Sequence, residues 1–234
     1  MTRLALFLLG SPRIERDGQT VRVRRRKELA LLAYLAVTGK NHSRDSLATL
    51  FWPEHDQSGA RGGVRRALGS LKRTLGEGWL DVDRETVGLS PGAGLSELSS
   101  ARRRELWLDV AQFRERLAES RTHTHDEQQV CPACLSSLAE AAALYGGDFM
   151  TGFTLRDSPG FDAWQFFQTE GLRQDLAGAL ARLAFGYGAR DDFESAIAYA
   201  RRWVALDALH EPAHRQLMWL YGPVRTPGRR SAPV

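Results

Sequence analysis

Residues 61–75 (RGGVRRALGSLKRTL) combine an apolar stripe with a cationic opposite face. At about 100° per residue, positions spaced by three and four share one side of an α-helix. The apolar positions at this spacing are Val64, Leu68, Leu71 and Leu75. On the same projection Arg66 and Arg73 fall opposite that stripe, and Arg61, Arg65 and Lys72 lie on its flank. The pattern predicts an amphipathic helix. A solvated surface helix would show the same pattern. The segments on either side of this helix distinguish between the two interpretations.

The segment before this helix opens with strand patterns. Leucines alternate with other residues over 4–8, which predicts a half-buried strand. Residues 13–16 and 19–23 flank Asp17 and Gly18, and an Asp-Gly pair between two such runs is a strong signal for a two-residue hairpin. The chain is therefore expected to begin with a small antiparallel sheet.

Two helices are predicted between this sheet and the cationic helix. Helical periodicity begins near Lys27 and ends at Gly39, the residue type that most often closes a helix. Ser43 is the expected N-cap of the second helix, because its hydroxyl can accept a bond from a first-turn N–H. Asp45 in that first turn complements the helix dipole, and Pro53 ends the helix.

A hairpin is predicted after the cationic helix. Gly76 closes the helix, and residues 80–82 and 87–89 alternate as two short strands around a tip at 83–86. A sheet, three helices and a terminal hairpin make the layout of a winged helix-turn-helix, whose third helix enters the DNA major groove. With its N-terminal sheet, the segment resembles the OmpR-type winged-helix domain.

The rest of the chain reads as helical. Residues 91–104 form a Ser/Gly/Pro-rich linker, and residues 222–234 form a Pro- and Arg-rich tail that is expected to be disordered. Helical patterns occupy 107–117, 135–145, 161–185, 193–206 and 212–221. The predicted fold class is mainly α. An α+β winged helix-turn-helix domain covers 1–90, and an all-α, tetratricopeptide-like domain covers 105–221.

An internal repeat lies in the last third of the chain. Its spacing fits a tetratricopeptide unit of about 34 residues. The matching positions are Leu180, Leu183, Ala184, Tyr187, Ala196, Ala200 and Trp203. Leu217, Met218 and Tyr221 follow Leu183, Ala184 and Tyr187 by 34 residues, so a second unit begins and then meets the tail. Because such arrays bury apolar surface by stacking neighbours, we expect either a cap from the preceding helices or a chain that is truncated relative to its relatives.

Charge divides the chain unevenly. Residues 1–75 carry 15 Lys and Arg against 6 Asp and Glu, whereas the remaining residues carry 17 against 22. A cationic N-terminal third on an acidic remainder predicts a module that binds a polyanion. Two cysteines in 234 residues cannot staple the fold, and no apolar run reaches membrane-spanning length, so a cytoplasmic protein is expected.

A candidate metal site lies in a polar segment of the helical half. His123, His125, Cys131 and Cys134 form H-x-H-x5-C-x2-C, and Cys-x2-Cys is a spacing that chelates zinc. A structural zinc is one interpretation of these four residues. A pair of thiols or a redox-sensitive disulfide is the other.

The sequence offers no enzyme signature. The G-x-x-x-x-G-K-[ST], G-x-S-x-G and H-E-x-x-H patterns are all missing, so no NTPase, serine hydrolase or zinc protease site is expected and the protein is not predicted to be an enzyme. The aromatic residues are expected to belong to the core rather than to a binding surface. They are Trp107, Trp164, Phe166, Phe167, Tyr187, Trp203 and Trp219.

Four segments resemble the bacterial transcriptional activator domain. They are WLDVAQF (107–113), LAEAAALYGGDFMTGFTLRDSPGFDAWQ (138–165), DDFESA (191–196) and ALDALHEPAHRQLM (205–218). Behind a winged helix, this domain gives the arrangement of the SARP family of antibiotic regulatory proteins, and the resemblance spans residues 4–221. It implies sequence-specific binding to double-stranded DNA, at direct repeats near promoters. It also implies transcriptional activation through contact with RNA polymerase, and it allows a homodimer on DNA in the bacterial nucleoid.

The predicted DNA-binding residues cluster on and around the cationic helix. Arg65, Arg66 and Arg73 are candidates to read bases, since arginine pairs bidentately with guanine. Phosphate contacts are expected from Lys72, Arg61 and Arg44 and from the run Arg24-Arg25-Arg26-Lys27. A solvated strand end is the other interpretation of that run. The remaining candidates for DNA contact are Ser70 on the helix and Arg84 beside it.

An alternative function remains open at the level of the sequence. Gly62 and Gly63 stand where relatives usually carry a polar residue in the recognition helix. The hairpin carries Asp81, Asp83 and Glu85 around a single arginine. These features favour a protein-interaction adaptor whose winged helix has lost specific DNA binding.

Overall fold

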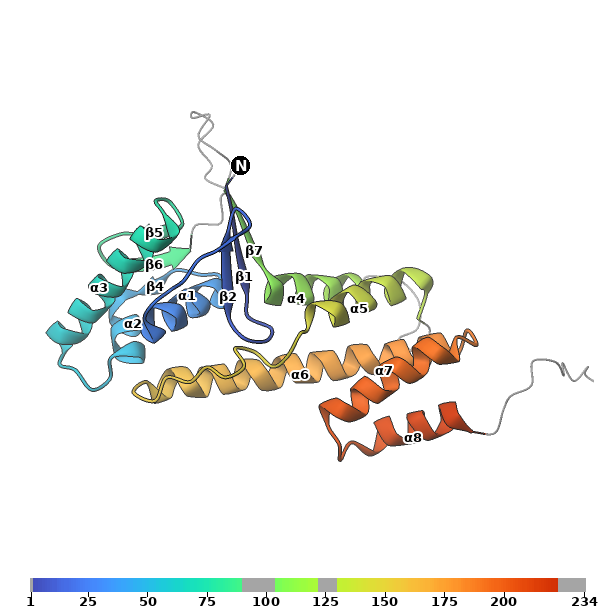
Figure 1. The fold of residues 1–234 in the computed structure, drawn as a ribbon. Coiled ribbons are helices and arrows are strands. Elements are labelled where there is room, and N and C mark those ends of the chain that lie inside the picture. The colour runs from blue at the N-terminus through green and yellow to red at the C-terminus, as the bar shows by residue number, and fades with distance from the viewer. Residues whose placement is uncertain (1, 90–103, 122–129, 223–234) are drawn as a thin grey trace, which may run out of the picture. The chain divides into compact units, whose positions relative to one another are not determined.

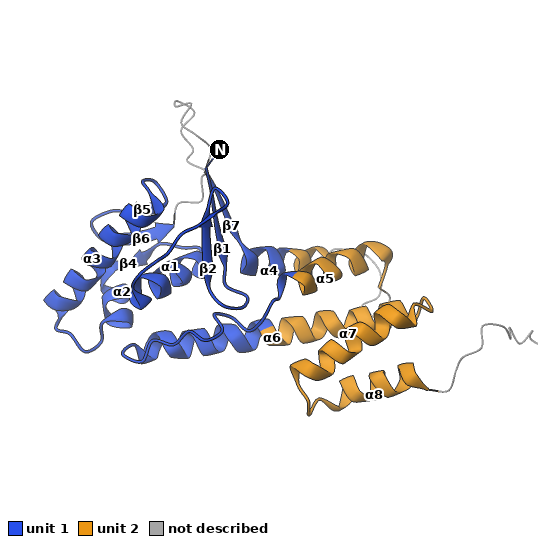
Figure 2. Cartoon of the chain, in the orientation of Figure 1, with its two compact units in different colours: residues 1–115, 144–172 blue, residues 116–143, 173–234 orange. Residues whose placement is uncertain are grey.

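The computed structural model describes residues 2–89, 104–121 and 130–222, and most of its elements are helices, which confirms the mainly α fold class (Figure 1). The chain forms two compact units (Figure 2). Unit 1 comprises Met1–Glu115 and Leu144–Leu172, and unit 2 comprises Arg116–Ala143 and Arg173–Val234. These two units are not the two domains expected from the sequence, 1–90 and 105–221. The domain boundaries expected at 90 and 105 stay a prediction.

Unit 1 begins with a four-stranded sheet in the order β3-β2-β1-β7. Its strands are β1 (Thr2–Phe7), β2 (Arg13–Arg16), β3 (Gln19–Thr20) and β7 (Arg104–Leu108). β1 pairs antiparallel with β2 and parallel with β7. Asp17 and Gly18 adopt φ values of 52° and 78°, as the turn of the predicted hairpin requires.

Strand β7 corrects the prediction that a helix begins at Trp107. Trp107 pairs with Ala5 in the sheet, and its ring centroid lies 4.8 Å from that of Phe7. Helix α4 (Asp109–Glu119) begins two residues later. The Asp109 carboxylate accepts hydrogen bonds from the backbone N–H groups of Leu8 (2.6 Å) and Leu9 (2.8 Å), and burial raises its pKa. A pairing between positions about a hundred residues apart leaves no mark on local periodicity.

The middle of unit 1 is a winged helix-turn-helix. Its helices are α1 (Arg26–Thr38), α2 (Arg44–Phe51) and α3 (Gln57–Leu75). Strands β4 (His42–Ser43), β5 (Leu80–Val82) and β6 (Thr86–Leu89) form a second sheet in the order β4-β6-β5. The predicted caps are confirmed, because Gly39 is left-handed (φ 63°) and the Ser43 hydroxyl accepts from the Ser46 N–H at 3.0 Å. Helix α3 starts four residues before the predicted stretch, where the Asp56 carboxylate accepts from the Gly59 N–H at 3.0 Å.

A distant segment completes the core of unit 1. Helix α6 (Pro159–Gly188) begins in this unit, and its Phe161 ring lies 5.4 Å from the ring of Phe51 in α2. The buried Ser158 hydroxyl donates to the Phe51 carbonyl at 3.0 Å. Trp164 packs edge-on against Tyr34 of α1, with ring centroids 4.9 Å apart. The start of α6 and the loop before it therefore stabilise the winged helix-turn-helix itself.

Unit 2 is helical throughout its described part. It contains most of α5 (Pro132–Leu144), the second half of α6, α7 (Phe193–Leu206) and α8 (Glu211–Tyr221). Ala184, Ala196, Ala200 and Leu220 form its buried cluster, with Tyr187 and Leu217 packed against it. Ala184, Ala196, Ala200, Tyr187 and Leu217 are positions of the predicted repeat. Met218 and Tyr221, which the repeat also placed on the buried face, are 72% and 51% exposed, and Leu220 takes their place in the cluster.

Three aromatic side chains expected in the core are exposed. Phe166 is 60% exposed, Phe167 is 70% exposed and Trp219 is 49% exposed. At about 100° per residue, Phe166 and Phe167 turn away from the side of α6 that buries Phe161. Within the described residues, no helix combines the length and the apolar character needed to cross a membrane.

Candidate nucleic-acid interface

Helix α3 separates its apolar and cationic residues as the sequence pattern predicts. Ala60, Val64, Ala67, Leu68, Leu71 and Leu75 are buried. Arg61, Arg65, Arg66 and Arg73 are exposed, and Ser70 and Lys72 are half-buried. The helix is anchored by a continuous apolar stripe, which leaves its cationic side toward solvent.

A groove runs between the start of α2, the first half of α3 and the β5–β6 hairpin, with a volume of about 720 Å³. We call it the wing groove. It is lined by Ser43, Arg44, Asp45, Gln57, Ser58, Arg61, Gly62, Arg65, Arg84 and Glu85. The fold thus brings together four of the predicted DNA-binding residues, Arg44, Arg61, Arg65 and Arg84. Arg66, Ser70, Lys72 and Arg73 lie outside this groove, on the remainder of α3.

Arg61 makes a bidentate ion pair inside the wing groove. Its Nε and Nη2 donate to the two carboxylate oxygens of Asp45 at 2.6 and 2.7 Å. The hydrogen bond from Arg61 holds the pKa of Asp45 below its usual value of 3.8. Both side chains are more than half exposed, so solvent and salt screen the pair, and its contribution to stability is small. The pair ties α3 to the first turn of α2.

Arg44 and Asp83 organise the turn between β5 and β6. Arg44 Nε and Nη2 donate to the Asp83 carbonyl at 3.1 and 2.7 Å. The Asp83 carboxylate accepts from the N–H groups of Thr86 (2.6 Å) and Glu85 (2.7 Å), and the Thr86 hydrogen bonds lower its pKa. Asp83, which the sequence presented as an unfavourable wing charge, is therefore a turn-forming residue. Arg84 is exposed beside it.

The glycines of α3 differ in what surrounds them. A Cβ at Gly63 would lie 2.5 Å from Cε2 of Trp52, so glycine is required there for the packing of α3 against the residue that ends α2. A Cβ at Gly62 would meet only Nη1 of Arg66 at 3.2 Å, and one at Gly69 would have nothing within 4 Å. Gly62 and Gly69 therefore add no side chain next to Arg66 and Arg73 on the exposed face. Sequence reasoning missed the packing role of Gly63, because its partner Trp52 lies in a separate helix-to-helix connection.

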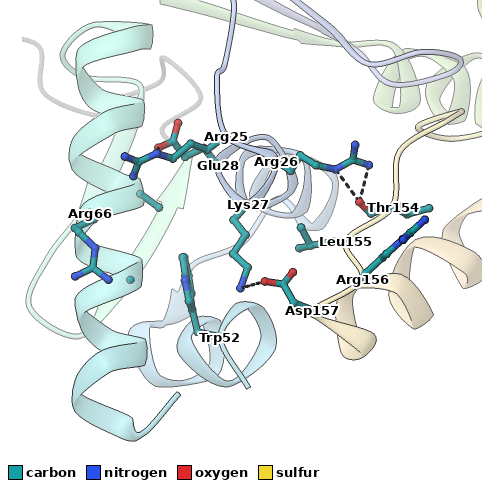
Figure 3. Close-up of a pocket in the computed structure, with 12 residues that line it drawn as sticks. Arg25, Arg26, Lys27, Glu28, Trp52, Arg66, Thr154, Leu155, Arg156 and Asp157 are labelled. Atoms are coloured by element: carbon teal, nitrogen blue, oxygen red, sulfur yellow. Dashed lines mark hydrogen bonds and ion pairs between the residues drawn. The ribbon is translucent and has the colours of Figure 1, made fainter. Parts of the chain in front are cut away.

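Two cations of the 24–27 run contact a later segment of unit 1 (Figure 3). Arg26 Nε and Nη2 donate to the carbonyl of Thr154 at 3.0 and 2.6 Å. Lys27 Nζ lies 2.7 Å from a carboxylate oxygen of Asp157. These contacts hold the 154–157 segment against the start of α1. Arg26 and Lys27 thus have partners within the fold, in contrast to the phosphate anchors that the sequence suggested.

Two of the four candidate zinc ligands, Cys131 and Cys134, are among the described residues. His123 and His125 lie outside the described residues. The sulfurs of Cys131 and Cys134 are 3.5 Å apart at the start of α5, and burial raises the pKa of the Cys134 thiol. Among the described residues, no group of three or more His, Cys, Asp or Glu is arranged to hold a metal ion. Zinc binding stays a prediction.

Comparisons with known proteins agree with this architecture. A family model described as the bacterial transcriptional activator domain matches residues 108–226, just over half of the chain. A structure of Mycobacterium tuberculosis EmbR in complex with a low-affinity phosphopeptide shares the fold with a TM-score of 0.69 and 21% identity. The match covers 94% of this chain but 55% of the EmbR chain, so this chain spans about half of that length. A search of curated proteins gives no match. The chain belongs to the bacterial transcriptional activator domain family, and a winged helix followed by this domain is the SARP-type arrangement.

Proposed function

We propose that this regulator binds double-stranded DNA sequence-specifically through α3 and activates transcription. One observation carries the proposal. Arg65, Arg66 and Arg73 stand exposed on α3, and the described part of the chain offers none of them an ion-pair partner. Unpaired guanidinium groups on the third helix of a winged helix-turn-helix are suited to the major groove.

The other polar residues of the interface are suited to the DNA backbone. Arg84 lines the wing groove and Lys72 flanks the unpaired arginines, so both are proposed as phosphate contacts. Arg44 would reach phosphate by exchanging the Asp83 carbonyl for it. Arg61 would reach phosphate by exchanging Asp45 for it, and Ser70 would add a hydrogen bond. Because Gly62 and Gly69 carry no side chain, the backbone of α3 can come closer to base edges than a fully substituted helix could.

The test is a titration of the full chain against a labelled fragment from upstream of its own operon, with an unrelated fragment as competitor. We expect Arg66→Ala and Arg73→Ala to weaken operator binding by about 1–3 kcal/mol each and to affect the unrelated fragment less. Arg201→Ala, an exposed arginine of α7, is the matched control and should change neither. Equal losses on both DNAs would reject base reading by Arg66 and Arg73.

Activation, contact with RNA polymerase, a homodimer on direct repeats and a place in the cytoplasm at the bacterial nucleoid are proposed from the SARP family. The competing function is a protein-interaction adaptor, which the exposed acids Asp81 and Glu85 of the hairpin favour. Salt separates the two functions, since each phosphate contact steepens the fall of affinity with salt. Weak binding with a shallow salt slope would favour the adaptor.

We also propose a structural zinc held by His123, His125, Cys131 and Cys134. Two thiolates on one tetrahedral zinc, each about 2.3 Å from the metal, lie between about 3.5 and about 4 Å apart. The observed separation of 3.5 Å is compatible with that arrangement. Native mass spectrometry should find one zinc per chain, lost in Cys131→Ser. A mass lower by two hydrogens, without zinc, would instead identify a disulfide.

A further inference from the structure

The two cysteines of the chain lie together at the start of α5, in unit 2. Cys131 immediately precedes the helix, which begins at Pro132, and Cys134 lies in the first turn. Both are reduced in this structure, and their sulfurs are 3.5 Å apart. A disulfide joins two sulfurs at about 2.0 Å, so small side-chain rotations would bring this pair to bonding distance.

The two sulfurs differ in their access to solvent. The Cys131 side chain is partly exposed, whereas Cys134 is fully buried. Oxidation of cysteine by a dissolved oxidant depends on exposure of the sulfur. Such an oxidant reaches Cys131 directly, and it reaches Cys134 only through Cys131.

Hydrogen bonds hold the Cys131 sulfur close to its partner. The backbone N–H of Cys134 donates to Cys131 Sγ at 3.4 Å, so the sulfur lies over the first turn of α5. The Cys131 carbonyl accepts from the N–H of Leu135 at 3.0 Å, which fixes the backbone at the same point. An oxidised Cys131 sulfur would therefore stay beside the Cys134 sulfur.

The Cys134 sulfur lies where three helices of unit 2 meet. Cys134 Sγ donates to the carbonyl of Ser120, the residue that follows α4, at 3.3 Å. Arg182 of α6 donates to the same serine, through Nη2 to the carbonyl at 3.1 Å and through Nη1 to the hydroxyl at 2.9 Å. A sulfur in a disulfide has no proton to donate. Closing the pair would remove the Cys134 bond and leave the Ser120 carbonyl to Arg182.

We propose that Cys131 and Cys134 form a peroxide-oxidisable pair, in which Cys131 attacks the oxidant and Cys134 resolves the product. In the first step the Cys131 sulfur attacks one oxygen of hydrogen peroxide, the O–O bond breaks, and a sulfenic acid and one water form. In the second step the Cys134 sulfur attacks the Cys131 sulfur, the S–O bond breaks, and the disulfide and a second water form. The two thiol protons leave in the two waters, and the two electrons lost by the sulfurs reduce the peroxide.

The proposal adds a regulation to the proposed zinc site, because the same two sulfurs take part. A sulfur in a disulfide is not a thiolate ligand, so oxidation would release a zinc bound there. This release rests on the proposed zinc, whereas the oxidation itself does not, since the sulfurs are already together. Neither depends on DNA binding by α3, which belongs to unit 1.

The first experiment treats the full chain with hydrogen peroxide after a chelator has removed any metal. Remaining thiols are then alkylated in denaturant, and the mass of the peptide with both cysteines is measured. We expect a peptide that is lighter by two hydrogens, carries no alkyl group and gains two after reduction with dithiothreitol. Met218, which is 72% exposed, reports the dose. Two alkylated thiols at doses that already oxidise Met218 would overturn the proposal.

Two variants test the order of the steps. Cys134→Ser keeps the attacking sulfur, so it should form a sulfenic acid that dimedone traps on Cys131. Cys131→Ser keeps only the buried sulfur, and it should lose its thiol at least about tenfold more slowly than Cys134→Ser. Equal rates would overturn the assigned order. Thermal unfolding checks that both variants fold, and Cys134→Ala replaces Cys134→Ser if the serine is not tolerated in the core.

The same oxidation after loading with zinc chloride separates this proposal from the zinc site. If zinc is bound, we expect slower oxidation and the release of one zinc for each disulfide, followed with a zinc-sensitive dye. Disulfide formation at an unchanged rate, with no zinc bound, would contradict the zinc site and support the oxidisable pair. Zinc binding without a disulfide in either preparation would overturn the pair and leave the zinc site in place.

Discussion

The two sides of α3 carry similar cations that have different surroundings. On the wing side, Arg61 pairs with Asp45 of α2, its neighbour in the helix-turn-helix. On the Trp52 side, Lys27 of α1 pairs with Asp157, which follows it by more than a hundred residues. Arg65 and Arg66, one on each side, have no ion-pair partner among the described residues. Residue type and exposure therefore do not assign the role of an arginine; the nearest acceptor does.

The largest expected effect comes from a substitution of Gly63, where α3 packs against Trp52. Gly63→Ala would place a Cβ 2.5 Å from the Trp52 ring, and neither the α3 backbone nor the buried indole can move away cheaply. We expect a loss of about 1–3 kcal/mol in the free energy of unfolding, as for other overpacked cores. Chemical denaturation followed by tryptophan fluorescence measures it. A variant as stable as the original chain would mean that Trp52 is not tightly packed on α3.

Most of the winged helix could be predicted from the sequence because its signals are local. The hairpin at Asp17 and Gly18, the cap at Ser43 and the stripe of α3 depend on residues within a few positions of one another. The parallel pairing of β7 with β1 could not be predicted in this way. Nor could the anchoring of the 154–157 segment on α1, since its hydrogen bonds join residues 128 apart. Periodicity carries no information about such contacts.

The candidate site shows the same limit. The cationic face of α3 was visible in the sequence, whereas the division of its arginines between paired and unpaired was not. Asp45 looked like a helix-capping charge, and it is also the partner of Arg61. Asp83 looked like an acidic residue that favours an adaptor over a DNA-binding protein, and it forms the turn. In both cases the role of the aspartate depends on the residue that it contacts in the folded chain, Arg61 for Asp45 and Thr86 for Asp83.

The next prediction compares a paired with an unpaired arginine inside the wing groove. Arg65→Ala should weaken operator binding by about 1–3 kcal/mol, since nothing in the described chain competes for its guanidinium. Arg61→Ala should weaken operator binding less than Arg65→Ala does, because DNA must first displace Asp45 from Arg61. Fluorescence anisotropy with a labelled operator measures both. The reverse order would show that Asp45 orients Arg61 for DNA rather than competing with it.

A smaller effect, of opposite sign to that of Gly63→Ala, is expected at Gly69 on the exposed face of α3. Gly69→Ala meets nothing within 4 Å, so it should raise the free energy of unfolding by up to about 1 kcal/mol through helix propensity. If the α3 backbone approaches base edges at this point, operator affinity should fall although stability rises. Thermal unfolding measures the stability of the variant, and fluorescence anisotropy on the same preparation measures its operator affinity. Unchanged affinity would place Gly69 away from the DNA.

The smallest effect is expected at Asp45 itself. Asp45→Asn removes a negative charge from the wing groove and releases Arg61, so operator affinity should rise by about two- to fivefold and the salt slope should steepen by about one unit. Stability should change little, because the pair is exposed to solvent.

The pH dependence of this pair has a defined sign. Since Arg61 lowers the pKa of Asp45 below 3.8, the pair is complete above that value and is lost only as the pH falls through the lowered pKa. The advantage of Asp45→Asn at the operator should therefore be the same from about pH 5 to about pH 8. Anisotropy titrations across that range check it. An advantage that grows toward pH 8 would point to another titrating group in the groove, and an affinity lower than that of the original chain would make Asp45 the residue that positions Arg61.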